Sequence, residues 1–388
     1  MRIIVFTHNI GGHHLEYIHH VHSMAIKDKD NQYVFVLPRK FDEIKDNLKW
    51  EHPDNIVFEL FDYKYGASEV TLWTLIRDSY SVSRLLRDFS LKYGADFIYC
   101  NEIIVTFPFA PLLIPRRTKL IGIVYKLYLY QDGSEPILKK TIERMKFWLM
   151  SVSGVYKRLL VLNDESGAKR LNELWHTKKF VQIPDPFVNI SLEGTYDLRA
   201  KFGINGDKVL FAHFGAMNDN KGTLEIAHSL LELSEDEKKK YSFFFAGKMA
   251  DNIKPEFYEI IERLKQKGEL EINIVDEYCS YSFFASLCMA CNAILTPYRR
   301  TAQSSGLIGY ASQFGKPVIA PSKGLLGNLV EKYKLGVLMH DCSPKSLIEA
   351  YGKVAKGKVS NPDREYCIEN SVEKFQEVLS RTIKDLKE

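Results

Sequence analysis

The feature that most constrains the fold is an alternation of short apolar strands with helices that runs through the chain twice. The first run begins with the apolar segment 2–7 and ends with the segment 180–183. A Pro-Asp-Pro sequence at 184–186 interrupts it, and the alternation restarts near Val209. Strands joined through helices pair in parallel, because each crossover helix returns the chain to the same edge of the sheet. The sequence therefore predicts an α/β protein with two Rossmann-like domains.

The length agrees with this division, because 388 residues exceed what one hydrophobic core usually holds. The predicted parts are an N-terminal domain over 1–186, a second domain over 187–362, and a C-terminal helix within 363–388 that packs back towards the first domain. Ligands of such sheets bind beyond the carboxyl ends of the strands, so we expect a site in a cleft between two facing domains.

The composition indicates a cytoplasmic protein. No run of about eighteen apolar residues is present, and the opening MRIIVFTHNIGG has the pattern of a first strand and not of a signal peptide. The six cysteines are scattered through apolar segments, as is typical of buried thiols in a reducing compartment. Cys288 and Cys291 form a C-x-x-C, but no second pair completes a zinc site.

One stretch, 296–321, combines the features of an anion site. A short strand ends at its first residue, Arg299 and Arg300 occupy the following loop, and the polar run 302–306 opens a helix. Helix N-termini present unpaired amides and partial positive charge, so a phosphate or diphosphate is the expected ligand. The alternative is an ordinary strand-to-helix turn of an α/β fold.

A second loop, 215–222, follows the first strand of the second half and ends in Lys221-Gly222. A lysine at the mouth of such a turn supplies a point charge to a phosphate. The alternative is a solvated lysine ahead of the helix that begins at Thr223.

The loop after the first strand contains Gly11-Gly12-His13-His14. Glycines allow a ligand to approach the backbone closely, and imidazoles bind a hydroxyl or act as a base. The spacing is not G-x-G-x-x-G, so dinucleotide binding is not predicted. Glu102, at another strand end, is a further candidate contact, with a surface carboxylate as the alternative.

Two patterns that suggest a metal are not supported. Six of the 11 histidines precede residue 23, but His19, His20 and His22 spread around a helix instead of converging. The Asp-Lys-Asp sequence at 28–30 matches a D-x-D motif but precedes its strand, at the edge opposite the strand carboxyl ends. No metal ligand is predicted.

Residues 112–170 hold 12 basic and 5 acidic residues beside several aromatic ones. A surface resting on anionic lipid is one interpretation. The other, which we favour, is a helix over 137–156 that packs on its own sheet with a basic outer face. The overall net charge of only +4 does not indicate nucleic-acid binding.

With these loops placed, the chain resembles GT-B glycosyltransferases, most of all the retaining family 4 (group 1) type. The resemblance covers nearly the full length and is strongest over 209–339. It is carried by the N-terminal glycine loop with its histidines, by Ile-Pro-Asp-Pro at 183–186, by Lys221-Gly222, and by 303–320 with the Lys-Gly that follows.

The resemblance implies transfer of a sugar from a UDP- or GDP-linked donor to a hydroxyl acceptor, with retention and without a cofactor or an obligatory metal. The acceptor would be a glycan or a lipid-linked molecule in cell-surface polysaccharide or glycan biosynthesis, used in the cytoplasm or at the inner membrane face. The implied catalytic residues are Lys221, Arg299, Arg300 and His13. The implied donor-binding residues are Gly215, Lys221, Gly222, Gln303, Ser304, Ser305, Gly306 and Leu307. The implied acceptor-side residues are Gly11, Gly12, His13, His14 and Glu102.

Four positions depart from the family pattern. The usual arginine after Gly215 is Ala216, and the acceptor-domain histidine is Tyr125. The two glutamates of the E-x7-E spacing fall on Ala302 and Tyr310. We expect Arg299 and Arg300 to supply the missing positive charge, since a leaving diphosphate requires charge and not one particular position. The departures leave open a non-catalytic GT-B protein that binds a partner enzyme or a nucleotide sugar, and a sugar-nucleotide epimerase of the same architecture.

Overall fold

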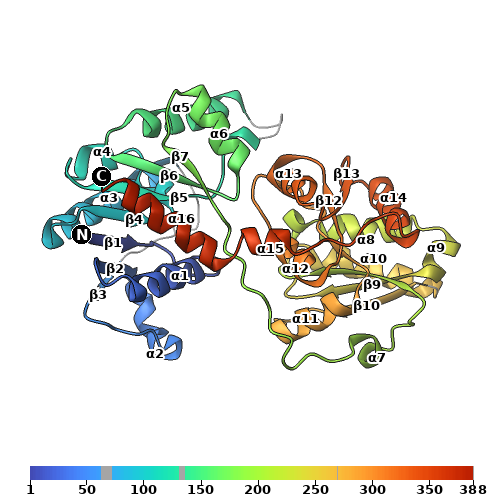
Figure 1. Ribbon diagram of the computed structural model, residues 1–388. Coiled ribbons are helices and arrows are strands. Elements are labelled where there is room, and N and C mark those ends of the chain that lie inside the picture. Colours follow the sequence, from blue (N-terminus) through green and yellow to red (C-terminus); the bar gives the residue numbers. More distant parts are fainter. Residues whose placement is uncertain (63–71, 131–135, 269, 388) are drawn as a thin grey trace. The chain divides into compact units, whose positions relative to one another are not determined.

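The computed structural model describes residues 1–62, 72–130, 136–268 and 270–387. Its internal contacts divide the chain into two units (Figure 1). The first unit contains residues 1–186 and 372–388, and the second contains 187–371.

Unit 1 is built on a parallel sheet in the order β3-β2-β1-β4-β5-β6-β7. Its strands are β1 (Arg2–Phe6), β2 (Gln32–Pro38), β3 (Ile56–Phe61), β4 (Phe97–Cys100), β5 (Lys119–Val124), β6 (Tyr156–Leu162) and β7 (Phe180–Ile183). Strands β1 and β4 are buried along almost their whole length, as expected for parallel strands covered by helices on both faces. The predicted doubly wound α/β sheet is confirmed for this unit.

Helices cover both faces of this sheet. They are α1 (His13–Lys27), α2 (Lys45–Leu48), α3 (Leu72–Tyr93), α4 (Ala110–Leu113), α5 (Ile137–Val152), α6 (Glu165–Leu174) and α16 (Val372–Asp385), with the 3-10 turns η1 (Arg39–Glu43), η2 (Ile103–Thr106) and η3 (Tyr128–Tyr130). One apolar core includes side chains of α3, α5 and α6, and the other includes side chains of α1 and α16. Figure 1 shows α16 beside α1, where Phe375, Leu379 and Ile383 join the second core.

Unit 2 repeats the plan with a parallel sheet in the order β10-β9-β8-β11-β12-β13. Its strands are β8 (Val209–Phe214), β9 (Tyr241–Ala246), β10 (Glu271–Val275), β11 (Ala293–Leu295), β12 (Val318–Pro321) and β13 (Gly336–Met339). Its helices are α7 (Leu198–Phe202), α8 (Thr223–Leu231), α9 (Glu235–Lys240), α10 (Lys254–Lys267), α11 (Tyr281–Ala290), α12 (Gly306–Phe314), α13 (Gly324–Lys332), α14 (Pro344–Ala355) and α15 (Glu365–Glu369), with the 3-10 turn η4 (Asp219–Lys221). The predicted pair of α/β sheets is thus present.

The structure differs from the sequence expectations at some element ends. Helix α5 ends at Val152 and not at Tyr156, because the Ser-Gly pair at 153–154 stops it and Tyr156 begins β6. The C-terminal segment is two helices, α15 and α16, and its residues 363–371 belong to unit 2. The sequence also predicts a long helix between about residues 69 and 92, and its residues 69–71 lie outside the described part of the chain. Cys288 and Cys291 are fully buried, as predicted.

Candidate functional site

Each sheet reverses its strand order at one point, between β1 and β4 in unit 1 and between β8 and β11 in unit 2. The loops that leave the carboxyl ends of two such strands diverge, and ligands of doubly wound sheets bind there. The predicted donor loops follow β8 and β11, and the predicted acceptor-side residues follow β1 and β4. The strand order therefore brings the predicted residues of each unit to one place on its own sheet.

In unit 2, Lys221 is held over an aromatic ring. Its Nζ lies 3.9 Å from the ring centroid of Tyr298, which follows β11. The backbone below it is fixed, because the Asn218 side chain accepts a hydrogen bond of 3.1 Å from the Lys221 amide. Gly222 then adopts φ 72°, and its backbone packs against Pro297 so closely that no side chain would fit between them. The Lys221 ammonium group is thereby placed against the loop that leads to α12.

Tyr298 connects this lysine to the N-terminus of α12. Its ring is 4% exposed, and its hydroxyl lies 3.0 Å from the Ser305 hydroxyl. Ser305 is the N-cap of α12, and its Oγ accepts a hydrogen bond of 3.3 Å from the Leu307 amide. The first turn of α12 therefore begins beside the Lys221 cation. Gln303 and Gly306 are exposed around this turn, while Ser304 is half-buried.

Asn220 holds the loop that carries the two arginines. Its carbonyl accepts a hydrogen bond of 3.0 Å from the Arg299 amide, and its Oδ1 accepts one of 2.9 Å from the Arg300 amide. The Arg299 guanidinium forms an ion pair with Glu225 of α8, which compensates part of its charge. The Arg300 side chain is exposed, and no ion pair of it is found in the described part of the chain. Lys221 and Arg300 are therefore the better placed of the predicted cations for an anion.

His213 of β8 supports the same loops from within the core. Its two ring nitrogens lie 3.1 Å from the Leu295 carbonyl and 3.0 Å from the Thr223 hydroxyl, so it joins β8, β11 and the start of α8. Burial, with the nearby Lys221 charge, lowers the pKa of His213 from 6.5 to about 4. The imidazole is therefore neutral at physiological pH.

We expect His213 to make unit 2 sensitive to acid. Its folded pKa is the lower one, so the unfolded state binds more protons between pH 6.5 and 4 and stability falls as the pH falls through that window. A pKa lowered from 6.5 to about 4 corresponds to about 3 kcal/mol. Urea denaturation of wild type and His213→Gln at pH 7.5 and pH 4.5 measures this. An equal loss of stability in both proteins would contradict the assignment.

In unit 1, the glycine loop after β1 opens directly into α1. The Asn9 side chain accepts a hydrogen bond of 2.8 Å from the Gly11 amide, and Gly12 is the N-cap of α1 with φ 54°. Gly12 provides no side-chain cap, and the His14 amide donates a hydrogen bond of 3.3 Å to the Gly11 carbonyl. His13 is exposed, and its ring stacks on that of His14 with 4.5 Å between centroids.

The end of β4 meets this loop through Asn101. The Asn101 amide nitrogen lies 3.2 Å from Nδ1 of His14 and also donates to the His14 carbonyl at 3.3 Å. The Tyr125 ring, which follows β5, lies 5.4 Å from the rings of both His13 and His14. Burial raises the pKa of Tyr125 well above its usual range, so the phenol stays protonated. Asp185, after β7, accepts a hydrogen bond from Tyr17 of α1.

A carboxyl and an imidazole are paired at the same edge. His8 Nε2 lies 3.5 Å from Glu102 Oε2. Burial lowers the pKa of His8 from 6.5 to about 4, and burial raises the pKa of Glu102 against the opposing effect of Lys126 and Lys146. Both groups are shifted towards their uncharged forms, and the His8 imidazole is neutral at physiological pH, which suits a hydroxyl better than a phosphate.

Two further histidines of α1, His20 and His22, are packing residues. The His22 ring stacks on Trp50 with 4.7 Å between centroids, and His20 is buried beside Phe375 of α16. The carboxylate of Asp28 accepts hydrogen bonds from Asn31 and Tyr33 in the turn before β2. Among the described residues, no group of three His, Cys, Asp or Glu side chains is arranged to hold a metal ion.

The surface of the basic segment 112–170 differs from the favoured expectation of a helix with a basic outer face. Residues 131–135 of this segment lie outside the described part of the chain. Helix α5 buries only Phe147, Met150 and Ser151. Its outer face carries large apolar side chains as well as the expected cations, which a helix packed on its own sheet does not require. No described helix is long and apolar enough to cross a membrane.

Several contact residues were not singled out from sequence. Tyr298, Asn220 and Glu225 position the donor-loop cations in unit 2, and His8 and Asn101 do the same for the histidines in unit 1. His8 and Asn101 each lie within two residues of a strand carboxyl end, and that position alone was the available signal. The contacts of Asn220 and Glu225 join the segment after β8 to the loop after β11, so no local sequence pattern predicts them.

Tyr310, one of the positions that depart from the family pattern, is a packing residue. The Tyr310 ring packs against Phe187 and Phe214 with centroid distances of 5.3 and 6.1 Å. Gly309, next to it, leaves no room for a side chain, because a Cβ would lie 2.2 Å from the Phe187 ring. The second glutamate position is thus occupied by a packed aromatic ring.

No family model and no curated protein sequence matches this chain. Solved structures do. Anabaena HepE in complex with UDP and glucose matches with a TM-score of 0.64 and 17% identity, covering 99% of this chain and 100% of that one. Sucrose-phosphate synthase from Thermosynechococcus elongatus matches with a TM-score of 0.69 and 15% identity over 99% and 98%. UDP-GlcNAc 2-epimerase from Methanocaldococcus jannaschii matches with a TM-score of 0.58 and 14% identity over 98% and 99%. At these identities the likeness confirms the predicted two-domain α/β fold.

Proposed function

We propose that the protein is a glycosyltransferase that moves a sugar from a nucleoside diphosphate donor to a hydroxyl acceptor. The observation that carries this proposal is the contact between Lys221, Tyr298 and the Ser305 cap of α12, at the point where the unit 2 sheet reverses. A cation and a helix N-terminus meet there, and together they suit a diphosphate. The UDP bound in the HepE structure and the activity that sucrose-phosphate synthase is named for support the same proposal.

In the proposed reaction the residues of unit 2 stabilise the leaving diphosphate. Lys221 and Arg300 supply positive charge, Arg299 supplies the part of its charge that Glu225 does not compensate, and the N-terminus of α12 supplies the partial positive charge of the helix dipole. The retaining course follows the family resemblance: the leaving phosphate takes the acceptor proton, so no protein nucleophile is required. Neither a cofactor nor a metal ion takes part.

Unit 1 is the proposed acceptor side. His13, exposed at the N-terminus of α1, would bind an acceptor or sugar hydroxyl, and His14 and Glu102 line the same edge with their partners Asn101 and His8. The proposed acceptor is a glycan or a lipid-linked glycan of cell-surface polysaccharide synthesis. A lipid-linked acceptor would place the enzyme in the cytoplasm at the inner membrane face.

A thermal-shift screen tests donor binding directly. UDP, GDP, ADP and their common sugars are added to the full chain at millimolar concentration without metal, and a ligand that binds only the folded state raises Tm. We expect one nucleotide series to raise it, and the matching sugar donor to turn over with EDTA present. The absence of both a shift and turnover would overturn the proposal.

We expect the two arginines to contribute unequally. Arg300→Ala should lower kcat/KM for the donor about fivefold, as for an exposed charge, and Arg299→Ala by less because Glu225 compensates that side chain. The double variant should lose about tenfold. Arg263→Ala, an exposed arginine on α10, is the matched control. Unchanged donor affinity and turnover in the double variant would remove both arginines from the site.

Two other functions make different predictions. The match to UDP-GlcNAc 2-epimerase favours an epimerase as the second candidate, and that enzyme would act on a nucleotide sugar with no acceptor present. A non-catalytic homologue, which Ala216, Ala302 and Tyr310 leave possible, would be stabilised by a nucleotide without turnover across many acceptors. The same screen, followed by product analysis, distinguishes all three.

A further inference from the structure

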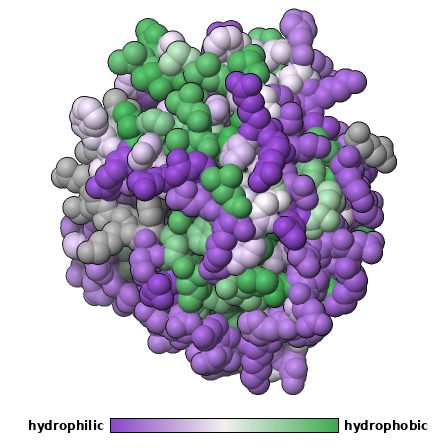
Figure 2. Space-filling view, turned by 90° about the vertical axis from the view of Figure 1, so that its left-hand side faces the viewer, coloured by the Kyte–Doolittle hydropathy of each residue, from purple (hydrophilic) through white to green (hydrophobic). Residues whose placement is uncertain are grey.

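Helix α5 of unit 1 exposes apolar side chains along its whole length. Ile137 is 83% exposed and Leu138 is 72% exposed. The other large apolar side chains exposed on α5 are Ile142, Met145, Trp148, Leu149 and Val152. A surface helix normally turns polar residues outward, and a continuous apolar face indicates contact with a partner. Figure 2 shows hydrophobic residues at several places on the side that faces the viewer, including its top.

Basic residues are interleaved with this apolar face. Helix α5 contains Lys139, Lys140, Arg144 and Lys146 against a single acidic residue, Glu143. Glu143 pairs with Lys146 at 2.6 Å. Beyond the helix C-terminus, the Lys179 ammonium donates to the Ser153 carbonyl at 2.6 Å and adds a further positive charge. A partner that complements this face therefore has both an apolar surface and negative charge.

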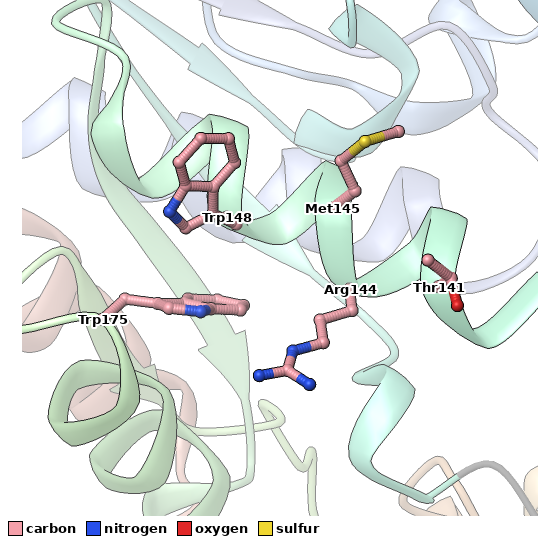
Figure 3. Close-up of a pocket in the computed structure, with 5 residues that line it drawn as sticks. All are labelled: Thr141, Arg144, Met145, Trp148 and Trp175. Carbon is pink, nitrogen blue, oxygen red and sulfur yellow. The ribbon is translucent and has the colours of Figure 1, made fainter.

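A pocket of about 420 Å³ opens on the same face. It is lined by Thr141, Arg144, Met145, Trp148 and Trp175. Figure 3 shows the two indole rings and the Arg144 guanidinium around one hollow. The Trp175 ring is held by the rings of Tyr128 and Phe180, at 6.2 and 5.7 Å, so this wall is preformed.

We propose that α5 and its pocket form a docking surface for an anionic lipid bilayer, with α5 lying in the plane of the interface. Indole rings favour the boundary between hydrocarbon and water, and the apolar side chains of α5 would enter the acyl region. The exposed Lys139 and Arg144 contact lipid phosphates, and the pocket admits part of one acyl chain. This proposal assigns to residues 137–152 the contact with anionic lipid that was the less favoured interpretation of the sequence.

Two other occupants fit less well. In a two-fold dimer through α5 the cations of both copies would face each other, which opposes association. A sugar chain would require several hydrogen-bonding groups, whereas only Thr141 and Arg144 among the lining residues have polar side-chain ends apart from the indole nitrogens. The bilayer alone combines a large apolar partner with negative charge.

Vesicle sedimentation tests the proposal. The full chain is mixed, without nucleotide sugar, with vesicles of phosphatidylcholine alone or with 30% phosphatidylglycerol. Wild type should bind the anionic vesicles. Lys139→Glu/Arg144→Glu should bind at least about 25-fold more weakly, because each basic residue lost costs about fivefold and each new carboxylate adds repulsion. Lys239→Glu/Lys240→Glu on α9 makes the same charge change in unit 2 and should bind as wild type.

A second pair of variants tests the apolar contribution. Trp148→Ser should weaken vesicle binding at least fivefold, while Trp73→Ser, which removes a tryptophan 80% exposed on α3, should not. Wild type that ignores anionic vesicles, or α5 variants that bind like wild type, would overturn the proposal. So would self-association through α5, or a Trp148-dependent affinity for oligosaccharides in place of vesicles. The docking surface adds a partner to the proposed transferase, and vesicle binding and sugar turnover are measured separately, so either can fail alone.

Discussion

Replacing Lys221 with methionine is expected to lower kcat/KM for the sugar donor about 100-fold and to abolish the Tm shift that the matching nucleotide produces in wild type. Methionine keeps most of the side-chain stem over Tyr298 but removes the charge that the proposal places against the diphosphate. Removing one such charge from a site that excludes water usually costs two to three powers of ten in turnover. Steady-state kinetics and thermal unfolding with and without nucleotide measure the two effects.

The matched control is Lys239→Met, an exposed lysine on α9 whose loss should change neither quantity. Lys221→Arg should recover part of the donor affinity, since charge is restored with a different shape. If Lys221→Met is stabilised by the nucleotide as strongly as wild type, the lysine has no donor contact and the site must be sought elsewhere.

Gly222→Ala is expected to have the largest effect on stability, with a loss of at least about 3 kcal/mol in the free energy of unfolding. The residue adopts φ 72°, which costs an alanine about 1 kcal/mol. In addition, a Cβ would lie 2.1 Å from the Pro297 carbonyl oxygen, and backbone cannot move aside cheaply. The loop after β11 would be displaced, so donor affinity should fall with stability. Urea denaturation of the full chain measures the first quantity.

Gly203→Ala separates the two contributions. Gly203 has φ 65°, but a Cβ there would meet nothing within 4 Å. We expect only the conformational cost of about 1 kcal/mol at this position. Equal losses for the two variants would show that the approach of Gly222 to Pro297 is not tight in solution.

The sequence predicts the strands of both sheets well, because each is a short apolar run between helices. Short helices are harder to predict from the sequence. The residue pattern over 41–49 predicts one helix, yet these residues form part of η1 and the separate α2, because Phe41 and Trp50 turn inward with ring centroids 5.2 Å apart. Tertiary packing decides this segment, and local propensity does not report it. Helix α9 had a readable signal, because Ser234 and Glu237 form a capping box.

The candidate site shows the same limit. The loops of Lys221 and of Arg299 could be proposed as a pair because both follow strand ends of one sheet. Their actual connection, through Tyr298 to Ser305 and through Asn220 to Arg300, joins residues whose distance depends on strand order. In unit 1, the sequence indicates Glu102 alone, because its partner His8 follows a different strand and the two meet only through the pairing of β1 with β4.

The position of α16 in unit 1 has a consequence for the order in which the chain folds as it is made. Phe375, Leu379 and Ile383 fill the core face that α1 shares with β1, yet the ribosome synthesises them after the whole of unit 2. Unit 2 is contiguous in sequence and has all its residues before α16 emerges. Unit 1 must keep that face of α1 uncovered until then, so the second half of the protein is free to reach its native state before the first.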